Sequence, residues 1–241
     1  MDFDHTEERR ILSDTVGKFI AKDYPVEKRV IAANSDLGFS HKIWLKLHEL
    51  GISHALFSEK FEGFGGHGFD IAVVFEALGK GLVVEPIFIS LISGDILSHS
   101  EKHFDLLQDI ISGMKRVAFA HFEEHSAYES NNILTKATNC KISGVKSMVQ
   151  FANGIDSVIV SAMDHDELKL YLVNAQAEGI KICDYQTIDG GRAAEITLNN
   201  VIGEELNINA EQVLISALGK GILALSSEAL GIMEHIKDLT I

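Results

Sequence analysis

Apolar side chains recur every three or four residues through the first 112 positions of the chain, which is the period of an amphipathic α-helix. Leu12, Val16 and Phe19 show the pattern behind an acidic first turn. The pattern predicts helices in five places: before Pro25, between Ser40 and Gly51, over residues 71–78, near 87–98 and near 102–112.

The period changes to two between Lys115 and about Asn200, which is typical of β-strands with one buried face. The predicted strands are VAFAHF, NILTKAT, KSMVQF, SVIVSAM, LKLYLVN, GIKICDY and AEITLNN. Short strands that alternate with turns indicate a small antiparallel barrel or sandwich.

A helical period returns from about residue 210 and continues to the last residue. Glycines 219, 221 and 231 lie inside this helix, and because glycine weakens a helix we expect them to permit close packing. The predicted fold class is therefore α+β with several domains. We expect an N-terminal all-α helical domain, a middle β-domain and a final helical segment, over residues 1–114, 115–205 and 206–241.

Composition narrows the class of protein. Hydrophobic residues make up 46% of the 241 residues, which suffices for a sizeable core, and the net charge of −14 argues against nucleic-acid binding. Cys140 and Cys183 form no C-x-x-C pair, so we expect two buried free thiols. The polar start MDFDHTEERR is not a signal peptide, and no apolar run reaches the ~20 residues of a membrane span. We expect a cytoplasmic protein with no membrane span.

Three short segments could carry chemistry. HFEEH, residues 121–125, fits the H-x-x-E-H pattern of one class of zinc peptidases. The segment continues a predicted strand, on which the two imidazoles would lie ~13 Å apart, so we expect no metal site. The glycine-rich GFGGHG, residues 63–68, fits a turn between helices about as well as a phosphate loop, and residues 144–156 fit a hairpin with a polar turn.

Taken in order, six segments resemble the acyl-CoA dehydrogenase family along the length of the chain. FSHKIWLKLHELGI resembles an early helix of the family, and FEGFGGHGFDIAVVFEALGKGL resembles its glycine loop and the next helix. VAFAHFEEHSAY takes the place of the strand usually written with LTEP, and GVKSMVQFANGIDSVIVSAM that of the strand written with WITNG. AEITLNNV resembles the edge before the last domain, and ALGKGILALSSEALGIMEHIKDLTI resembles the helix that opens it.

The resemblance implies an enzyme that binds FAD, removes the α-proton of an acyl-CoA and passes the β-hydride to flavin N5. His121 and Phe122 stand at the flavin-binding Leu-Thr pair of the family, and Met148 and Gln150 stand at its Trp-x-Thr pair. Backbone donors would remain at the first pair, while Met148 could cover an aromatic face and Gln150 could donate a hydrogen bond. Tyr128 stands at the position that contacts the CoA arm.

These departures make the chain similar to the small subunits of two-subunit, pimeloyl-CoA-type dehydrogenases. On this resemblance, residues 206–241 are the first helix of a truncated C-terminal helical bundle, with an apolar face exposed and prone to association. The catalytic glutamate of the family lies beyond Ile241, so no catalytic residue is assigned, and Glu123 is expected to be structural.

Two functions fit the sequence. In the first, the chain is an acyl-CoA dehydrogenase or a subunit of one, which works in a homo- or hetero-oligomer with another such subunit and passes electrons to an acceptor protein. In the second, it is a non-catalytic subunit of the same fold that binds or stabilises a catalytic partner.

Overall fold

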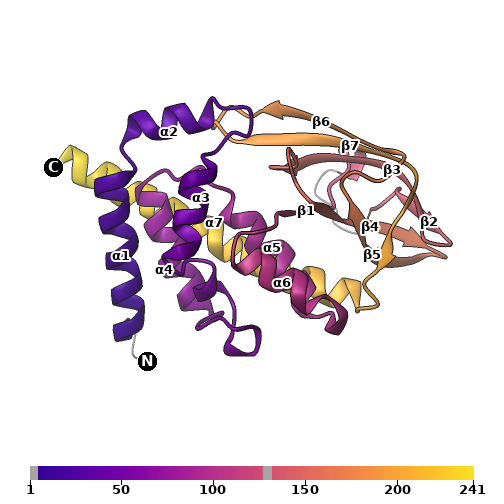
Figure 1. The fold of residues 1–241 in the computed structure, drawn as a ribbon, viewed down its shortest axis with the longest axis horizontal. Coiled ribbons are helices and arrows are strands. Elements are labelled where there is room, and N and C mark those ends of the chain that lie inside the picture. Colours follow the sequence, from indigo (N-terminus) through magenta and orange to yellow (C-terminus); the bar gives the residue numbers. More distant parts are fainter. Residues whose placement is uncertain (1–4, 127–131) are drawn as a thin grey trace.

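The computed structural model describes residues 5–126 and 132–241. Helices gather at one end of the molecule and strands at the other, and the last helix extends from the strands to the far side of the helical end (Figure 1). The α-helices are α1 (Glu7–Asp23), α2 (Val26–Ala33), α3 (His41–Glu49), α4 (Gly68–Lys80), α5 (Ile87–Ser98), α6 (Phe104–Ile111) and α7 (Ala210–Thr240). All five predicted helices of the first 112 residues, and the final one, are confirmed.

The sequence pattern missed α2. Pro25 does end α1, but it is also the N-cap residue of α2, where its missing N–H is no loss. The helix has only eight residues, too few to establish an apolar period, and it buries only Ala32 and Ala33. Short 3-10 helices complete the list of helical elements: η1 (His54–Leu56), η2 (Glu59–Phe61), η3 (Glu101–His103) and η4 (Glu124–Ser126).

The glycine-rich stretch GFGGHG is a tightly packed turn in front of α4. A Cβ on Gly65 would lie 2.2 Å from the backbone oxygen of Ala55, and one on Gly63 would lie 2.1 Å from that of Phe57. The glycines therefore serve close backbone approach, which favours the structural alternative over a phosphate loop.

The strands form one sheet in the order β6-β7-β3-β2-β4-β5-β8, with β1 paired to β4. The strands are β1 (Val117–Ala120), β2 (Lys136–Thr138), β3 (Lys141–Gln150), β4 (Ser157–Asp164), β5 (Glu167–Asn174), β6 (Ile180–Gln186), β7 (Arg192–Ile202) and β8 (Glu204–Glu205). Most neighbours are antiparallel as predicted, but β1 and β2 run parallel to β4. The expected β-domain is confirmed, as a mixed sheet with its own buried apolar core.

The two cysteines lie at the surface, so the expectation of buried thiols was wrong. Cys140 is in the turn between β2 and β3 with a positive φ of 59°. Cys183 is on β6, at the edge of the sheet. In both places the backbone geometry keeps the side chain out of the core.

Helix α7 packs along α4 and α5. A Cβ on Gly231 would lie 2.0 Å from the backbone oxygen of Glu76, and one on Gly79 of α4 would lie 2.2 Å from that of Glu228. The prediction of close packing is confirmed for Gly231 but wrong for Gly219, which has no neighbouring atom within 4 Å of its Cβ position.

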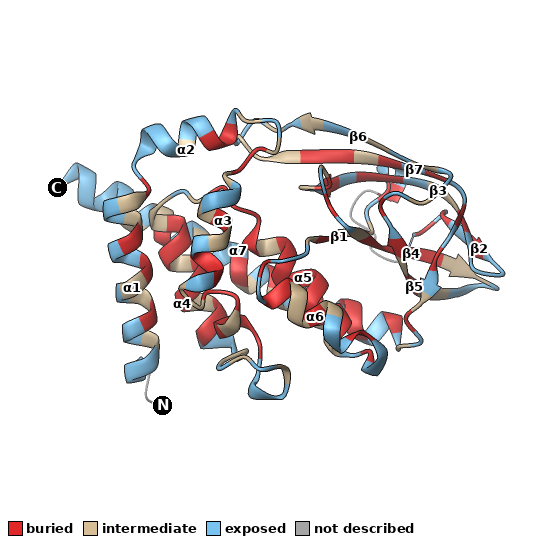
Figure 2. Cartoon of the chain, viewed as in Figure 1, coloured by how far each residue is buried: buried red, intermediate tan, exposed pale blue. Residues whose placement is uncertain are grey.

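Helix α7 also exposes large apolar side chains along its length, as expected, and Figure 2 shows its end beyond the other helices as exposed. They include Ile215, Leu218, Ile222, Leu225, Met233, Ile236 and Leu239. Against expectation, α7 is long and apolar enough, by length and composition, to cross a membrane. Core helices pass the same test, and 33% of its apolar window is buried against the rest of the chain.

Candidate functional site

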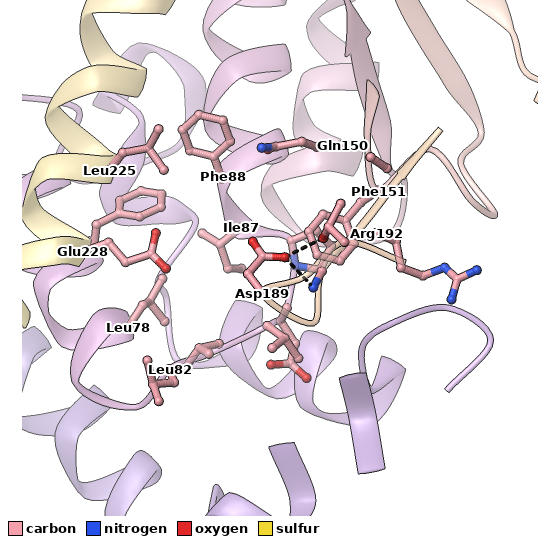
Figure 3. Close-up of a pocket in the computed structure, with 18 of the residues that line it drawn as sticks. Leu78, Leu82, Ile87, Phe88, Gln150, Phe151, Asp189, Arg192, Leu225 and Glu228 are labelled. Carbon is pink, nitrogen blue, oxygen red and sulfur yellow. Dashed lines mark hydrogen bonds between the residues drawn. The ribbon is translucent and has the colours of Figure 1, made fainter. Parts of the chain in front are cut away.

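A cavity of about 580 Å³ lies where the helices, the sheet and α7 meet (Figure 3). Its walls come from α4, the 82–88 segment, β3, the turn between β6 and β7, and α7. Most of the wall is apolar, including Phe75, Leu78, Ile87, Phe88, Leu225 and Ile232. Another cavity, of about 690 Å³, lies between the β4–β5 turn and the start of α7, and neither Met148 nor Gln150 lines it.

Met148 and Gln150, two of the residues expected to bind flavin, line the 580 Å³ cavity. A register shift in β3 between Lys146 and Val149 lets Met148 adopt a φ of 54°. The Tyr185 hydroxyl lies 3.1 Å from the Met148 sulfur. The Gln150 side chain is exposed and extends across the cavity toward Phe88 (Figure 3). Its amide makes no hydrogen bond within the part of the chain that the structure describes, so it is available to a ligand.

His121 and Phe122 follow β1 and lie beside β3, outside the lining of this cavity. The Ser147 backbone N–H donates to the Phe122 backbone oxygen over 2.9 Å. This hydrogen bond holds Phe122 beside Ser147, the residue that precedes Met148. His121 Nδ1 lies 2.9 Å from Ser161 Oγ. The structure thus brings the two expected pairs onto adjacent segments, although only the second pair faces the cavity. Tyr128 lies outside the described residues.

The HFEEH motif does not form a helix. Strand β1 ends at Ala120, and η4 begins only at Glu124, so the two imidazoles do not share a helical face. His125 Nε2 lies 3.6 Å from Glu123 Oε2. Over residues 5–126 and 132–241, no group of three His, Cys, Asp or Glu side chains is arranged to hold a metal ion.

A buried ion pair ties the segment after β1 to β3. Lys146 is fully buried, and its Nζ donates to Glu123 Oε1 over 2.6 Å, to Ser161 Oγ over 3.0 Å and to the His121 oxygen over 3.2 Å. Burial lowers the pKa of Lys146 to about 8, against the opposing effect of Glu123. Burial would raise the pKa of Glu123, but hydrogen bonds from Lys146 and from residues 134–135 lower it overall. Glu123 is structural, as expected.

Sequence reasoning did not single out Lys146. Its signal is the strand period, which places this lysine four residues after the buried Ile142 and therefore on the same face of β3. A lysine at such a position requires an anionic partner.

Three carboxyl groups also line the cavity, and sequence reasoning missed all of them. Glu228 comes from α7, Asp189 from the β6–β7 turn and Glu85 from the segment before α5. Figure 3 shows the carboxyl groups of Glu228 and Asp189 directed toward one another across the cavity. They come from three separate segments of the chain, and periodicity within one segment does not indicate that they meet.

Comparison with known proteins agrees with this architecture. Residues 6–99 match the model of the acyl-CoA dehydrogenase N-terminal domain. The chain is 32% identical over 111 residues to acyl-CoA dehydrogenase IpdE2 of Mycolicibacterium smegmatis, a match that covers 46% of this chain and 35% of the relative. It is 33% identical over 82 residues to IpdE2 of Mycobacterium tuberculosis, which covers 34% of this chain and 26% of the relative.

Solved structures share the fold at lower identity. A variant of the Tcur3481-Tcur3483 steroid ACAD superposes with a TM-score of 0.87 at 21% identity, over 97% of this chain and 65% of that chain. The ChsE4-ChsE5 complex of Mycobacterium tuberculosis gives 0.84 at 20% identity, over 98% and 66%. Glutaryl-CoA dehydrogenase of Mycobacterium smegmatis, in complex with FADH2, gives 0.82 at 17% identity, over 94% and 62%.

Family match, curated relatives and fold agree: the chain is similar to acyl-CoA dehydrogenases, and residues 6–99 match the N-terminal domain of that family. The match to the first curated relative spans about a third of that protein, with 35% covered, and the first solved chain is covered over 65% of its length.

Proposed function

We propose that the chain is an FAD-dependent acyl-CoA dehydrogenase, or a subunit of one, that catalyses α,β-dehydrogenation of an acyl-CoA thioester. The observation that carries the proposal is the position of Met148 and Gln150. Both stand at flavin-binding positions of the family, and both line a cavity with apolar walls from α4, α5 and α7. A cavity of this kind, with few polar groups, is typical of a cofactor or substrate site.

The residues of the cavity fit a flavin ring. Gln150 presents an amide without a partner among the described residues, which can donate to or accept from a ring heteroatom. Met148, exposed by 52%, and Phe88 present a thioether and an aromatic ring that can cover a flat face. When bound, FAD would supply the acceptor for the hydride that leaves the β-carbon.

The chain's own residues would bind, orient and exclude water. Gln150 would hydrogen-bond the ring, and Phe88 and Leu225 would exclude water from the acyl group. The Glu123–Lys146 pair holds the segment of His121 and Phe122 against β3, and we propose these two residues as further flavin contacts through their backbone. We propose Tyr128 as a contact of the CoA arm, and we assign no α-proton base.

The division of the chain is also a proposal. One buried apolar cluster draws all its members except Ala224 of α7 from residues 1–114, and another lies within 115–205, which supports a helical domain and a β-domain. A third cluster joins α5, β4 and α7 at their junction. The segment 206–241 would open a further helical domain. We propose a cytoplasmic location, an oligomer with another acyl-CoA dehydrogenase subunit and an electron-acceptor protein as partner.

The experiment is flavin retention and turnover. The purified chain, alone and with a candidate partner subunit, is incubated with FAD and desalted, and the flavin absorbance per chain is measured. Gln150→Leu should lower FAD affinity about tenfold, the loss of one or two hydrogen bonds to a ring. Gln186→Leu, an exposed glutamine of β6 outside the cavity lining, is the matched control and should leave affinity unchanged.

The outcomes separate the two functions. Absence of flavin, even with the partner present, would contradict the proposal. Turnover of an acyl-CoA with an artificial electron acceptor by this chain alone would eliminate a non-catalytic role. Flavin that is bound only by the complex, with no turnover by the chain alone, would favour the non-catalytic subunit. The replacement of the family's Trp-x-Thr pair by Met148 and Gln150 also favours that role.

A further inference from the structure

The carboxyl of Glu228 stands without a protein partner in an apolar part of the cavity. It comes from α7 between Leu225 and Ile232, which line the same wall. Among the residues the structure describes, its carboxyl makes no hydrogen bond and no ion pair. The close contact between the Glu228 backbone and Gly79 fixes α7 here, so the side chain cannot leave the cavity by a shift of the helix. An unpaired, half-buried carboxylate of this kind is costly unless a ligand donates to it.

The carboxyl that faces Glu228 does not relieve it. Asp189 Oδ1 accepts from Thr187 Oγ1 and from the Gly191 N–H, and these hydrogen bonds lower the pKa of Asp189, so it stays an anion. Burial, and then the charge of Asp189, raise the pKa of Glu228. Two facing carboxylates repel one another and attract a positive or hydrogen-donating group between them.

A third carboxyl adds a second orphaned acceptor. Glu85 is only 5% exposed and lines the cavity. Its Oε1 accepts from the Ser40 N–H over 3.1 Å, while Oε2 has no hydrogen-bond partner in the described part of the chain. Burial raises the pKa of Glu85, and the nearby Tyr24 hydroxyl opposes that rise.

The two arginines of the cavity do not pair with these acids. Arg29 Nε donates to the Leu82 oxygen over 2.8 Å, and its Nη2 donates to the backbone oxygen of Asp189 over 3.3 Å. Arg192 pairs with Asp184. The arginines therefore form no ion pair with the carboxyl groups of Glu228, Asp189 or Glu85.

This inference rests on the proposed function. We propose that the acyl group bound in this cavity carries a hydrogen-bond donor, either a hydroxyl or a protonated amine. The carboxyl of Glu228 accepts this hydrogen bond, and Glu85 offers a second acceptor. The thioester end would lie toward Gln150 and Met148, and the donor toward α7 and the 82–88 segment. An acyl chain that ends in a carboxylate would be repelled, and a plain aliphatic chain would leave the acceptors unpaired.

The test measures binding of four matched series of CoA thioesters to the full chain supplied with FAD, by titration calorimetry. The series are plain, ω-hydroxy, ω-amino and ω-carboxy acyl groups of four, six and eight carbons. At the best length, we expect the hydroxy or amino thioester to bind about tenfold tighter than the plain one, and the carboxy thioester to bind weakest.

Variants identify the acceptor. Glu228→Gln, which keeps an acceptor but removes the charge, should weaken the amino thioester about tenfold and the hydroxy one less. Glu228→Leu should weaken both and leave the plain thioester unchanged or tighter. Glu234→Gln is the control, since this α7 carboxylate pairs with Lys80 and does not line the cavity. Circular dichroism reports whether each variant folds, and the comparison of thioesters on the unmodified chain stands without any variant.

Two results would overturn the inference. One is tightest binding of the plain thioester at every length, and the other is a preference for a donor that survives Glu228→Leu. If no thioester of any series binds, either to the chain alone or to its complex with the partner subunit, the proposed function itself fails and the inference falls with it. Binding of the plain series without a donor preference refutes the inference alone.

Discussion

An alanine at position 231 tests how closely α7 must approach α4 to build the cavity. The new Cβ would lie 2.0 Å from the backbone oxygen of Glu76, whereas non-bonded atoms in contact are about 3.5–4.0 Å apart. Backbone atoms cannot rotate away as a side-chain end can, so α4 and α7 must separate or the end of α7 must detach. Either change moves the wall that carries Glu228.

The magnitude follows from two opposing effects. Overpacking of a tight contact costs about 3 kcal/mol at its upper range. Replacing glycine by alanine inside a helix raises the free energy of unfolding by about 1 kcal/mol. Gly231→Ala should therefore lower the free energy of unfolding by about 2 kcal/mol. Gly219→Ala, in the same helix but with no neighbouring atom within 4 Å, should raise it by about 0.5–1 kcal/mol.

Urea denaturation followed by circular dichroism measures both free energies. Gly79→Ala should reproduce the loss, because its Cβ would lie 2.2 Å from the backbone oxygen of Glu228 across the same contact. The reasoning is refuted if Gly231→Ala is as stable as the unmodified chain, or if Gly219→Ala is equally destabilised.

Lys146→Met should lower the free energy of unfolding by about 3–5 kcal/mol, because it leaves the Glu123 carboxylate buried without its partner. Adding Glu123→Gln should restore part of the loss. A loss below about 1 kcal/mol in urea denaturation would contradict this prediction. Burial of the ring lowers the pKa of His48 in the folded protein from its ordinary value of 6.5 to about 4. Unfolding therefore takes up a proton between these two pH values. The free energy of unfolding should fall by about 3 kcal/mol as the pH falls through this window. His48→Gln should remove this contribution from the pH profile of unfolding, and an unchanged profile would show that His48 does not cause it. Sedimentation velocity should show self-association through the apolar face of α7, and Ile222→Lys with Ile236→Lys should abolish it, since both side chains are exposed; association that persists in the double variant would place the contact elsewhere.

The sequence pattern predicted the elements well because their signals are local. Helix spacing, N-caps such as Ser40 and the two-residue period of the strands depend on neighbours along the chain, and the predicted elements are all present. The exceptions have different causes. Helix α2 has only eight residues, too few to establish a period, whereas the parallel pairing of β1 with β4 depends on segments about 40 residues apart.

The candidate site was predictable only in part. Motif resemblance selected Met148 and Gln150, which line the cavity, and His121 and Phe122, which lie beside β3. It offered nothing for Glu228, because a single glutamate in an apolar helix reads as a solvent-facing position.

The sequence by itself determined the order of helices, strands and final helix, the apolar faces that pack them and the family they resemble. Only the tertiary structure decided which side chains share one space. Glu85, Asp189 and Glu228 are more than 30 residues apart along the chain, and they converge because α7 returns across α4 at a distance that Gly79 and Gly231 permit. The pairing of Lys146 with Glu123 is likewise set by the sheet. Local sequence fixes periodicity, whereas burial and charge pairing depend on contacts between distant segments, which no short-range pattern records.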